Sequence, residues 1–150
     1  MVRSMAGWGP VQSVAIGGLV AVGFIDEQRV IVGSHSGLGI IDAPSGTSVE
    51  RVSDVAGSYE WFSETPPSAT WVDLEGVQTV PVAGLWGGSL LDSTADGWRC
   101  SRSATGAVVR GPSESTIDIA DAEEFRAFGF SPGGRVFVYA SSPTLYLVSR

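Results

Sequence analysis

The chain has 150 residues and a mass of 15.6 kDa, enough for one domain that buries its own core without disulfides or a structural metal. Hydrophobic residues make up 43% of the chain, which excludes intrinsic disorder. Sixteen acids face nine basic residues, all of them arginine, so the net charge of −7 argues against nucleic-acid binding and favours a basic protein partner.

An uncharged stretch, residues 4–25, opens the chain. Its apolar part, 14–25, is as hydrophobic as a signal-peptide core, but Pro10 and Gln12 interrupt the stretch. Three glycines also break up a span that is barely long enough for a transmembrane helix. A β-hairpin accounts for the same residues more completely, so we expect a soluble, cytoplasmic protein that does not contact a membrane.

Residues 17–53 alternate β-branched runs with turns rich in glycine, proline, serine and aspartate. This alternation is typical of antiparallel strands joined by tight hairpins. It predicts a four-stranded unit with strands at 20–24, 29–33, 38–42 and 47–52. The twenty glycines and eight prolines of the whole chain likewise indicate an all-β fold.

Aromatic and acidic residues gather in the long connection 54–71. A connection of this length is expected either to cover an end of the fold, with Trp61 and Trp71 as plugs, or to face a partner. A tryptophan in a glycine-flanked bend, Trp86, is similar in kind. Because Trp and Tyr often anchor interfaces, the candidate partner-binding residues are Tyr59, Glu60, Trp61, Phe62, Glu64, Trp71 and Trp86.

A second unit is predicted over residues 77–111, with strands at 78–83, 88–92, 98–101 and 107–110. The Asp-Gly pair at 96–97 is a hairpin turn signal. Pro81 lies within the first of these strands, which predicts that this strand is at a sheet edge or a bulge.

The last unit, 118–150, repeats part of the first. Residues 127–138 (AFGFSPGGRVFV) align without gaps to 21–32 (AVGFIDEQRVIV), and the next strands, 144–148 and 38–42, follow in the same register. The last unit lacks a fourth strand after Val148. We expect the N-terminal strand, 11–16, to supply it.

The residues FGFSPGGRVFV at 128–138 resemble the Phe-Ser-Pro-(Asp/Gly)-Gly-(Arg/Lys) start of β-propeller blades of the WD40 or YVTN kind. The stretch IIDAPSGT at 40–47 is similar to the end of the third strand of such blades, where an Asp precedes a Ser-Gly or Thr-Gly turn. The resemblance covers about 70 residues and implies a propeller-like arrangement of three blade-like units. It implies nothing about activity.

Three units are fewer than the four to eight blades of a typical propeller. The sequence therefore leaves three architectures open: a half-ring that a second copy completes as a homodimer, a β-prism, and a β-trefoil. In each case we expect 11–16 and 144–148 to pair, within one chain or between two, because folded proteins cover their strand edges.

Catalytic and metal-binding chemistry has weak support in the sequence. His35 and Cys100 are the only residues of their types, which excludes an intrachain disulfide and a His/Cys zinc site. Each is interpreted as structural, although His35 could act as a base and Cys100 has arginine neighbours. The acidic run Asp118, Asp121, Glu123 and Glu124 lacks calcium-loop spacing and is interpreted as a solvated loop, so we expect no metal and no cofactor.

Three functions are compatible with these patterns. The first is a non-enzymatic protein-interaction domain of the immunity or antitoxin type, which inhibits a basic partner through charge complementarity. The second is a carbohydrate-binding module or a small hydrolase with an aromatic cleft, where Trp61, Trp71, Trp86 or Trp98 would stack on a sugar ring. The third is a structural unit that self-assembles.

Overall fold

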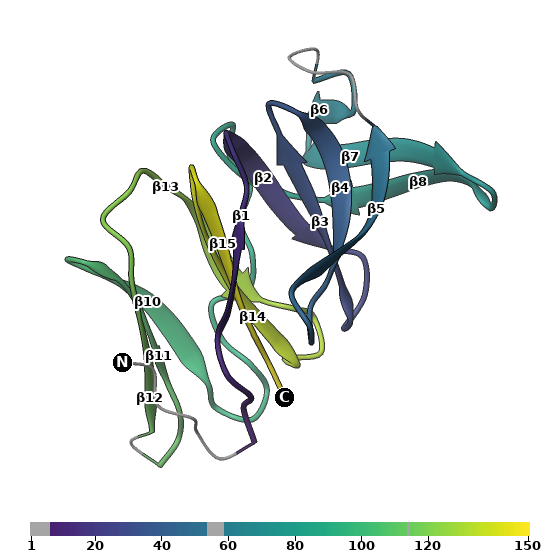
Figure 1. Ribbon diagram of the computed structural model, residues 1–150. Helices are drawn as coiled ribbons and strands as arrows, with labels where there is room; N and C mark the ends of the chain where they lie inside the picture. The colour runs from purple at the N-terminus through teal and green to yellow at the C-terminus, as the bar shows by residue number, and fades with distance from the viewer. Residues whose placement is uncertain (1–6, 54–58, 114) are drawn as a thin grey trace.

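The computed structural model describes residues 7–53, 59–113 and 115–150, and in these ranges the chain forms β-strands and no helix (Figure 1). The all-β fold class is confirmed. The strands form four antiparallel sheets, each given in its spatial order, so that strands named next to each other are hydrogen-bonded. Sheet A contains β1 (Gln12–Ala15), β15 (Thr144–Ser149), β14 (Val136–Ser141) and β13 (Phe125–Phe130). Sheet B contains β5 (Thr47–Ser53), β4 (Gly37–Asp42), β3 (Arg29–Ser34), β2 (Leu19–Phe24) and β9 (Ala83–Gly84). Sheet C contains β6 (Phe62–Glu64), β7 (Pro67–Asp73) and β8 (Gly76–Pro81), and sheet D contains β10 (Arg99–Ser103), β11 (Gly106–Arg110) and β12 (Thr116–Ala120).

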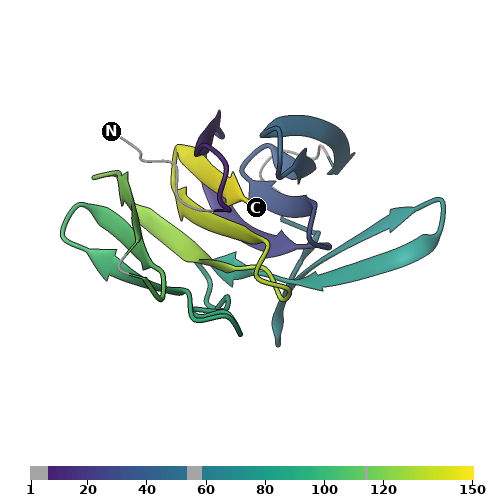
Figure 2. The ribbon, with the colours of Figure 1, turned by 90° about the horizontal axis from the view of Figure 1, so that it is seen from below.

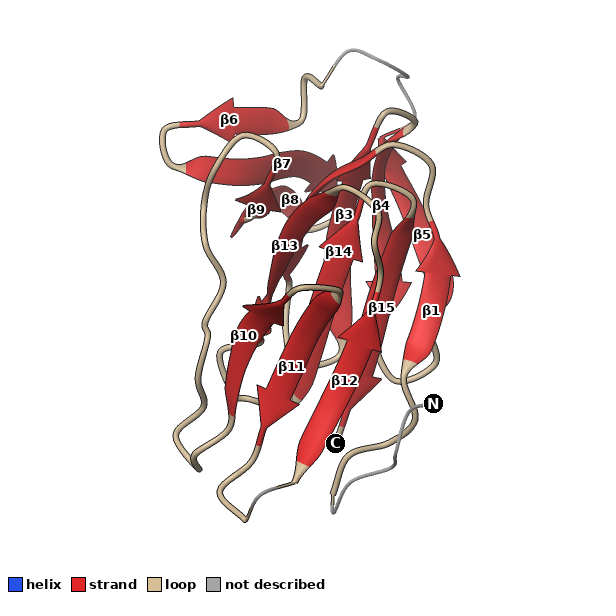
Figure 3. Ribbon diagram, turned by 90° about the vertical axis from the view of Figure 1, so that its left-hand side faces the viewer, coloured by secondary structure: helices blue, strands red, loops and turns tan. Residues whose placement is uncertain are grey.

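The four sheets stack in the order D, A, B, C, with one hydrophobic core between each pair of neighbours (Figures 1 and 3). The D–A core includes Val109 and Phe137, the A–B core includes Val22 and Val138, and the B–C core includes Ile31. Strands β2 and β14 lie inside the stack and are buried on both faces, which explains their nearly continuous apolar sequences. Among the described residues no core cluster joins sheet C to sheet D, so the row is open.

Sheet B contains the first predicted unit. Its strands β2 to β5 match the predicted ones to within one or two residues, and the hairpins between them are antiparallel as expected. The predicted closing strand is confirmed too, because β1 pairs antiparallel with β15, from Gln12 opposite Leu147 to Ala15 opposite Thr144. The N-terminal strand therefore completes sheet A.

The gapless alignment of the two repeats is wrong beyond the hairpin. In sheet B, Phe24 pairs with Val30, whereas in sheet A, Phe130 pairs with Phe137. The second hairpin is one residue longer, so the strand after it is shifted by one position relative to the alignment. The repeat is real in β2 and β13, and both strands carry a register shift just before the aligned alanine, Ala21 or Ala127.

Two other predictions are corrected. The unit predicted over 77–111 is divided between two sheets. Strand β8 pairs within sheet C, and β10 and β11 belong to sheet D. The strand predicted at 88–92 does not form, and these residues are part of the connection between the two sheets. The connection predicted over 54–71 contains β6 and most of β7, and only residues 54–58 of it lie outside the described residues. Four sheets therefore replace the three predicted units.

Residues 82–93, called the strap below, connect all four sheets. Backbone hydrogen bonds join the strap to Pro67 at 3.1 Å, to Val20 at 2.8 Å, to Phe130 at 2.7 Å and to Cys100 at 2.9 Å, one residue in each sheet. The strap thus covers the exposed edges of β2, β13 and β10, which would otherwise present unpaired backbone groups. Figure 3 shows the loop that leads to β10 running along one side of the stack.

Two glycines at the same position of the repeat make room for the strap and for Pro81, the residue directly before it. A Cβ on Gly23 would collide with the carbonyl oxygen of Pro81, and one on Gly129 would lie 2.8 Å from the carbonyl oxygen of Leu91. No other residue allows the two backbones to approach so closely. The glycine at this position therefore has the same role in both repeats, which is to let the backbone of another segment approach the strand.

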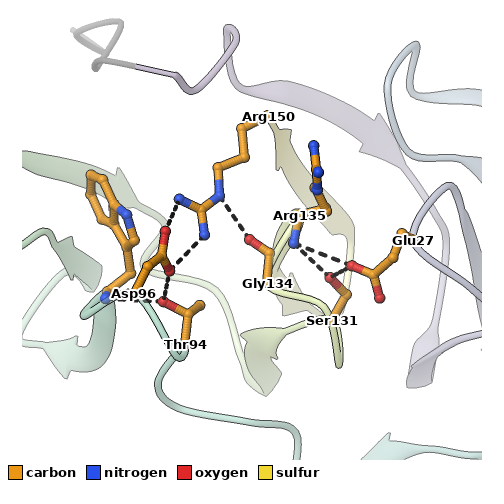
Figure 4. A network of polar contacts seen from close by, with 8 residues as sticks. Glu27, Thr94, Asp96, Ser131, Gly134, Arg135 and Arg150 are labelled. Carbon is orange, nitrogen blue, oxygen red and sulfur yellow. Dashed lines mark hydrogen bonds and ion pairs between the residues drawn. The ribbon is translucent and has the colours of Figure 1, made fainter.

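Polar contacts hold one rim of the stack together (Figure 4). Glu27, in the β2–β3 turn, accepts hydrogen bonds from the Ser131 hydroxyl and from the backbone N–H groups of Gly133, at 2.9 Å, and Arg135, at 3.2 Å. Burial raises the pKa of Glu27, but these hydrogen bonds outweigh burial and lower the pKa below its usual value. Glu27 thus joins sheet B to the β13–β14 turn of sheet A.

Arg150 performs the same function between sheets A and D. Its guanidinium donates two hydrogen bonds to the Asp96 carboxylate, at 2.7 and 2.9 Å, and one to the carbonyl of Gly134, at 2.9 Å. It also lies 4.7 Å from the ring centroid of Trp8, within cation–π range. The hydrogen bonds from Arg150 and Thr94 lower the pKa of Asp96 well below its usual range.

Candidate functional site

Three of the predicted partner-binding residues meet on the surface. The Trp86 ring contacts Tyr59, with centroids 4.9 Å apart, and Phe62, with centroids 4.8 Å apart. His35 joins them from the β3–β4 turn, 6.5 Å from Tyr59 and edge-on to it. These four residues, His35, Tyr59, Phe62 and Trp86, are called the aromatic patch below.

A tight turn of the strap presents Trp86. Gly84 and Gly87 exchange backbone hydrogen bonds of 3.0 and 3.2 Å, which leaves Leu85 and Trp86 at the tip of the turn. Gly87 has a φ of 102° and Gly88 a φ of 88°, values that favour glycine. The Trp86 side chain is 38% exposed although two aromatic rings fix it. Trp86 is therefore an accessible ring that is held in place by its neighbours. Exposed tryptophans of this kind are enriched among the residues that dominate interface energies.

The other two predicted tryptophans are buried. Trp61 is 4% exposed and Trp71 is 6% exposed, and both belong to the core between sheets B and C. The interpretation of these two residues as contacts for a partner is therefore corrected: they pack inside the fold. Trp61 lies beneath the patch, 6.2 Å from Tyr59 and 5.9 Å from Phe62, and supports both rings.

Gly33 provides the space that Trp61 fills. A Cβ on Gly33 would lie 2.7 Å from Cζ3 of the Trp61 ring, and two further ring carbons would be closer still. The indole therefore lies flat against the backbone of β3. The sequence singled out Trp61 as a candidate contact for a partner. In the structure Trp61 supports Tyr59 and Phe62 from the core.

Two exposed carboxylates accompany the patch. Glu60 follows Tyr59 in the turn that leads to β6, and Glu64 ends β6. Both lie on the same short segment as the aromatic residues, and no arginine or histidine occurs in that segment. Because side chains alternate along a strand, Glu64 lies on the same face of β6 as Phe62, a member of the patch.

The negative charge of the chain is concentrated in one stretch of the sequence. Residues 52–98 contain seven of the sixteen acids and no arginine, lysine or histidine, so this stretch carries the whole net charge of −7. The other residues contain nine acids and nine arginines and are neutral in sum. Among the described acids of this stretch, Asp92 and Asp96 lie beside sheet D, where Asp96 pairs with Arg150. The other four lie in sheet C or directly before it, with no basic residue among them: Glu60, Glu64, Asp73 and Glu75.

The remaining candidate residues show no catalytic arrangement. Burial and the neighbouring Asp92 raise the pKa of the Cys100 thiol to about 12, so the thiol is protonated at neutral pH. Cys100 is buried and packs as a residue of the core. In the predicted acidic run, Asp121 accepts a hydrogen bond from Ser141 at 2.8 Å and Glu124 pairs with Arg126 at 2.7 Å.

Among the described residues, no group of three His, Cys, Asp or Glu side chains is placed to hold a metal ion. The described ranges also contain no helix with the length and apolar character needed to cross a bilayer.

Comparison of the chain with protein-family models, with curated proteins and with solved structures finds no match.

Proposed function

We propose that this chain is a non-enzymatic interaction domain whose aromatic patch binds a basic partner protein. The observation that carries the proposal is the position of Trp86, an exposed ring fixed by Tyr59 and Phe62 within the stretch that holds the whole net charge. An arginine or lysine of the partner would stack on Trp86, and Glu60 and Glu64 would neutralise its charge.

The preorganised patch supports this function because binding would require little ordering of side chains. Trp61 and Gly33 hold the rings from below, so the anchor keeps its position before a partner arrives. A domain of this kind suits inhibition of the immunity or antitoxin type, in which an acidic surface covers a basic one.

Binding of three synthetic peptides of equal length, one arginine-rich, one glutamate-rich and one uncharged, tests the proposal by calorimetry. We expect only the arginine-rich peptide to bind, with an affinity that falls as salt rises. Trp86→Ala should weaken this binding about tenfold or more, which corresponds to 1.4 kcal/mol. The matched control is Leu91→Ala, an exposed apolar residue of the strap outside the patch, and it should leave the affinity unchanged.

A second pair of variants separates the patch from general charge attraction. Replacing Glu60 and Glu64 with Gln should weaken binding more than replacing Glu50 and Glu123, two exposed acids outside the acidic stretch. Equal losses for the two pairs, or binding that survives Trp86→Ala, would refute the proposed site.

The sugar-binding alternative uses the same exposed ring and is distinguished by the ligand. A titration of intrinsic tryptophan fluorescence with a panel of oligosaccharides would favour it if a sugar shifted the emission of the wild type but not of Trp86→Ala. Peptide binding without a sugar response would favour the interaction domain.

A further inference from the structure

The two sheets at the ends of the row each have a face that no described residue covers. In sheet C, Ala69 and Trp71 point into the core, so the alternate pairs Thr70–Thr79 and Val72–Val77 point away from it. Val72 is 71% exposed and Val77 is 70% exposed. The outward positions carry no charged side chain, and among them Ser68 is buried: Ser63, Ser68, Thr70, Val72, Val77, Thr79 and Pro81.

Sheet D presents a different face. Cys100 and Val109 are buried toward sheet A, so their neighbours in the ladder point outward. Arg99 and Arg110 form one cross-strand pair there, and Val108 lies at the centre of the middle strand. Val108 pairs with Ser101 and with Asp118, and these outward positions together hold two positive charges and one negative charge.

Charge favours contact between these two different faces over contact between identical ones. Sheet C with its two turns, residues 62–81, contains three acids and no basic residue, so two copies of sheet C would repel each other. Sheet D offers two arginines to this acidic sheet, where Glu75 is exposed in the β7–β8 turn. Glu64 and Asp73 are also exposed, at strand ends, although alternation places them on the other face. Arginine stems also cover apolar surface while the guanidinium reaches a carboxylate at the rim.

The arrangement of the sheets allows the two contacts to form together. Seen from below, sheets D and C extend to opposite sides of the molecule, with A and B between them (Figure 2). All three cores in the chain are made by one sheet face on another, which is the geometry that a fourth contact would repeat.

We infer that two copies of the chain pair head to tail, with sheet C of each on sheet D of the other. A two-fold axis makes the two contacts identical and closes eight sheets into a propeller-like ring, the upper end of the usual blade number. This dimer does not depend on the binding of a basic partner, because the aromatic patch lies on the other face of sheet C. Phe62 of the patch pairs with Ala69, and Ala69 points toward sheet B.

Sedimentation velocity over a range of concentrations measures the mass without any partner. We expect the mass of two chains for the wild type, and the mass of one chain, 15.6 kDa, for Val72→Glu and for Val108→Glu. The control is Val49→Glu, which places the same charge on β5, outside both faces, at a residue that is 58% exposed. It should remain a dimer, and circular dichroism should show that all three variants are folded.

Mixing the two monomeric variants gives the decisive result. Only a head-to-tail pair leaves one intact contact in the mixture, between sheet C of Val108→Glu and sheet D of Val72→Glu, so mixing should restore a two-chain species. A wild type that stays at one chain at every concentration would overturn the inference, as would open polymers. Dimers of Val108→Glu alone would also overturn it, because they would show that sheet D is not part of the contact.

Discussion

Replacing Gly33 with alanine should disturb the support of the aromatic patch more than its single methyl group suggests. The new Cβ would lie 2.7 Å from Cζ3 of Trp61, with two ring carbons nearer, whereas ordinary contact begins at 3.4 Å. The ring would have to move by about 1 Å or more in a close-packed core. Overpacking of this kind costs about 1–3 kcal/mol of the free energy of unfolding.

Gly39→Ala is the matched control. Gly39 lies in the neighbouring strand β4, opposite Val32, and its added Cβ would be 3.5 Å from the carbonyl oxygen of Glu50. Alanine is favoured over glycine in a strand by about 0.5–1 kcal/mol, so this variant should be neutral or slightly more stable. Urea denaturation of both variants measures the difference.

A double-mutant cycle tests the cause. In a Trp61→Ala background the space beside β3 is empty, so the loss caused by Gly33→Ala should largely disappear. A Gly33→Ala variant as stable as Gly39→Ala would refute the packing of Trp61 on β3, and so would a loss of the same size with and without Trp61.

Three further predictions concern the stack. Phe130→Ala should cost about 3–5 kcal/mol in urea denaturation, because Phe130 is fully buried, while Phe24→Ala should cost less because Phe24 is only half-buried; equal losses would contradict this difference. Arg150→Ala should lower the melting temperature more than Arg29→Ala, since Arg150 joins two sheets and stacks on Trp8, whereas Arg29 forms an exposed pair with Asp26; the reverse order would count against the rim contacts. The pKa of Glu27 is lowered in the folded state, so the stability that its carboxylate contributes is complete above the usual value of 4.5 and is lost as the pH falls through the folded pKa. The melting temperature should therefore decrease less steeply below pH 4.5 in Glu27→Gln than in the wild type. Parallel curves for the two proteins would contradict this.

Local pattern predicted strands better than it predicted sheets. The four strands of 17–53 were predictable because each hairpin has its own turn residues, so sequence neighbours are also spatial neighbours. Strands β8, β10 and β11 were predicted too, but assigned to one unit, because nothing local shows that the strap separates them. Residues 88–92 were predicted as a strand of that unit, whereas they belong to the strap along the edges of other sheets.

The hairpin of β6 and β7 was missed because two prolines, Pro66 and Pro67, follow each other where the chain turns from one strand to the other. Prolines usually indicate a loop, but Pro67 is the first residue of β7, a position where a strand tolerates proline. Tyr59, Phe62 and Trp86 were identified from their residue types, while their contact depends on the fold. The absence of basic residues over 52–98 is readable from the sequence alone, but that Glu60, Glu64, Asp73 and Glu75 gather at sheet C while Asp92 and Asp96 lie beside sheet D depends on the fold.

Fluorine NMR on protein labelled with 5-fluorotryptophan tests most directly whether Trp86 is the anchor for a basic partner. The chain has five tryptophans, and Trp86→Phe identifies the resonance of Trp86. On addition of the arginine-rich peptide, we expect the Trp86 resonance to shift the most while those of buried Trp61 and Trp71 move little. A peptide that binds while the Trp86 resonance stays in place would contradict the proposed function.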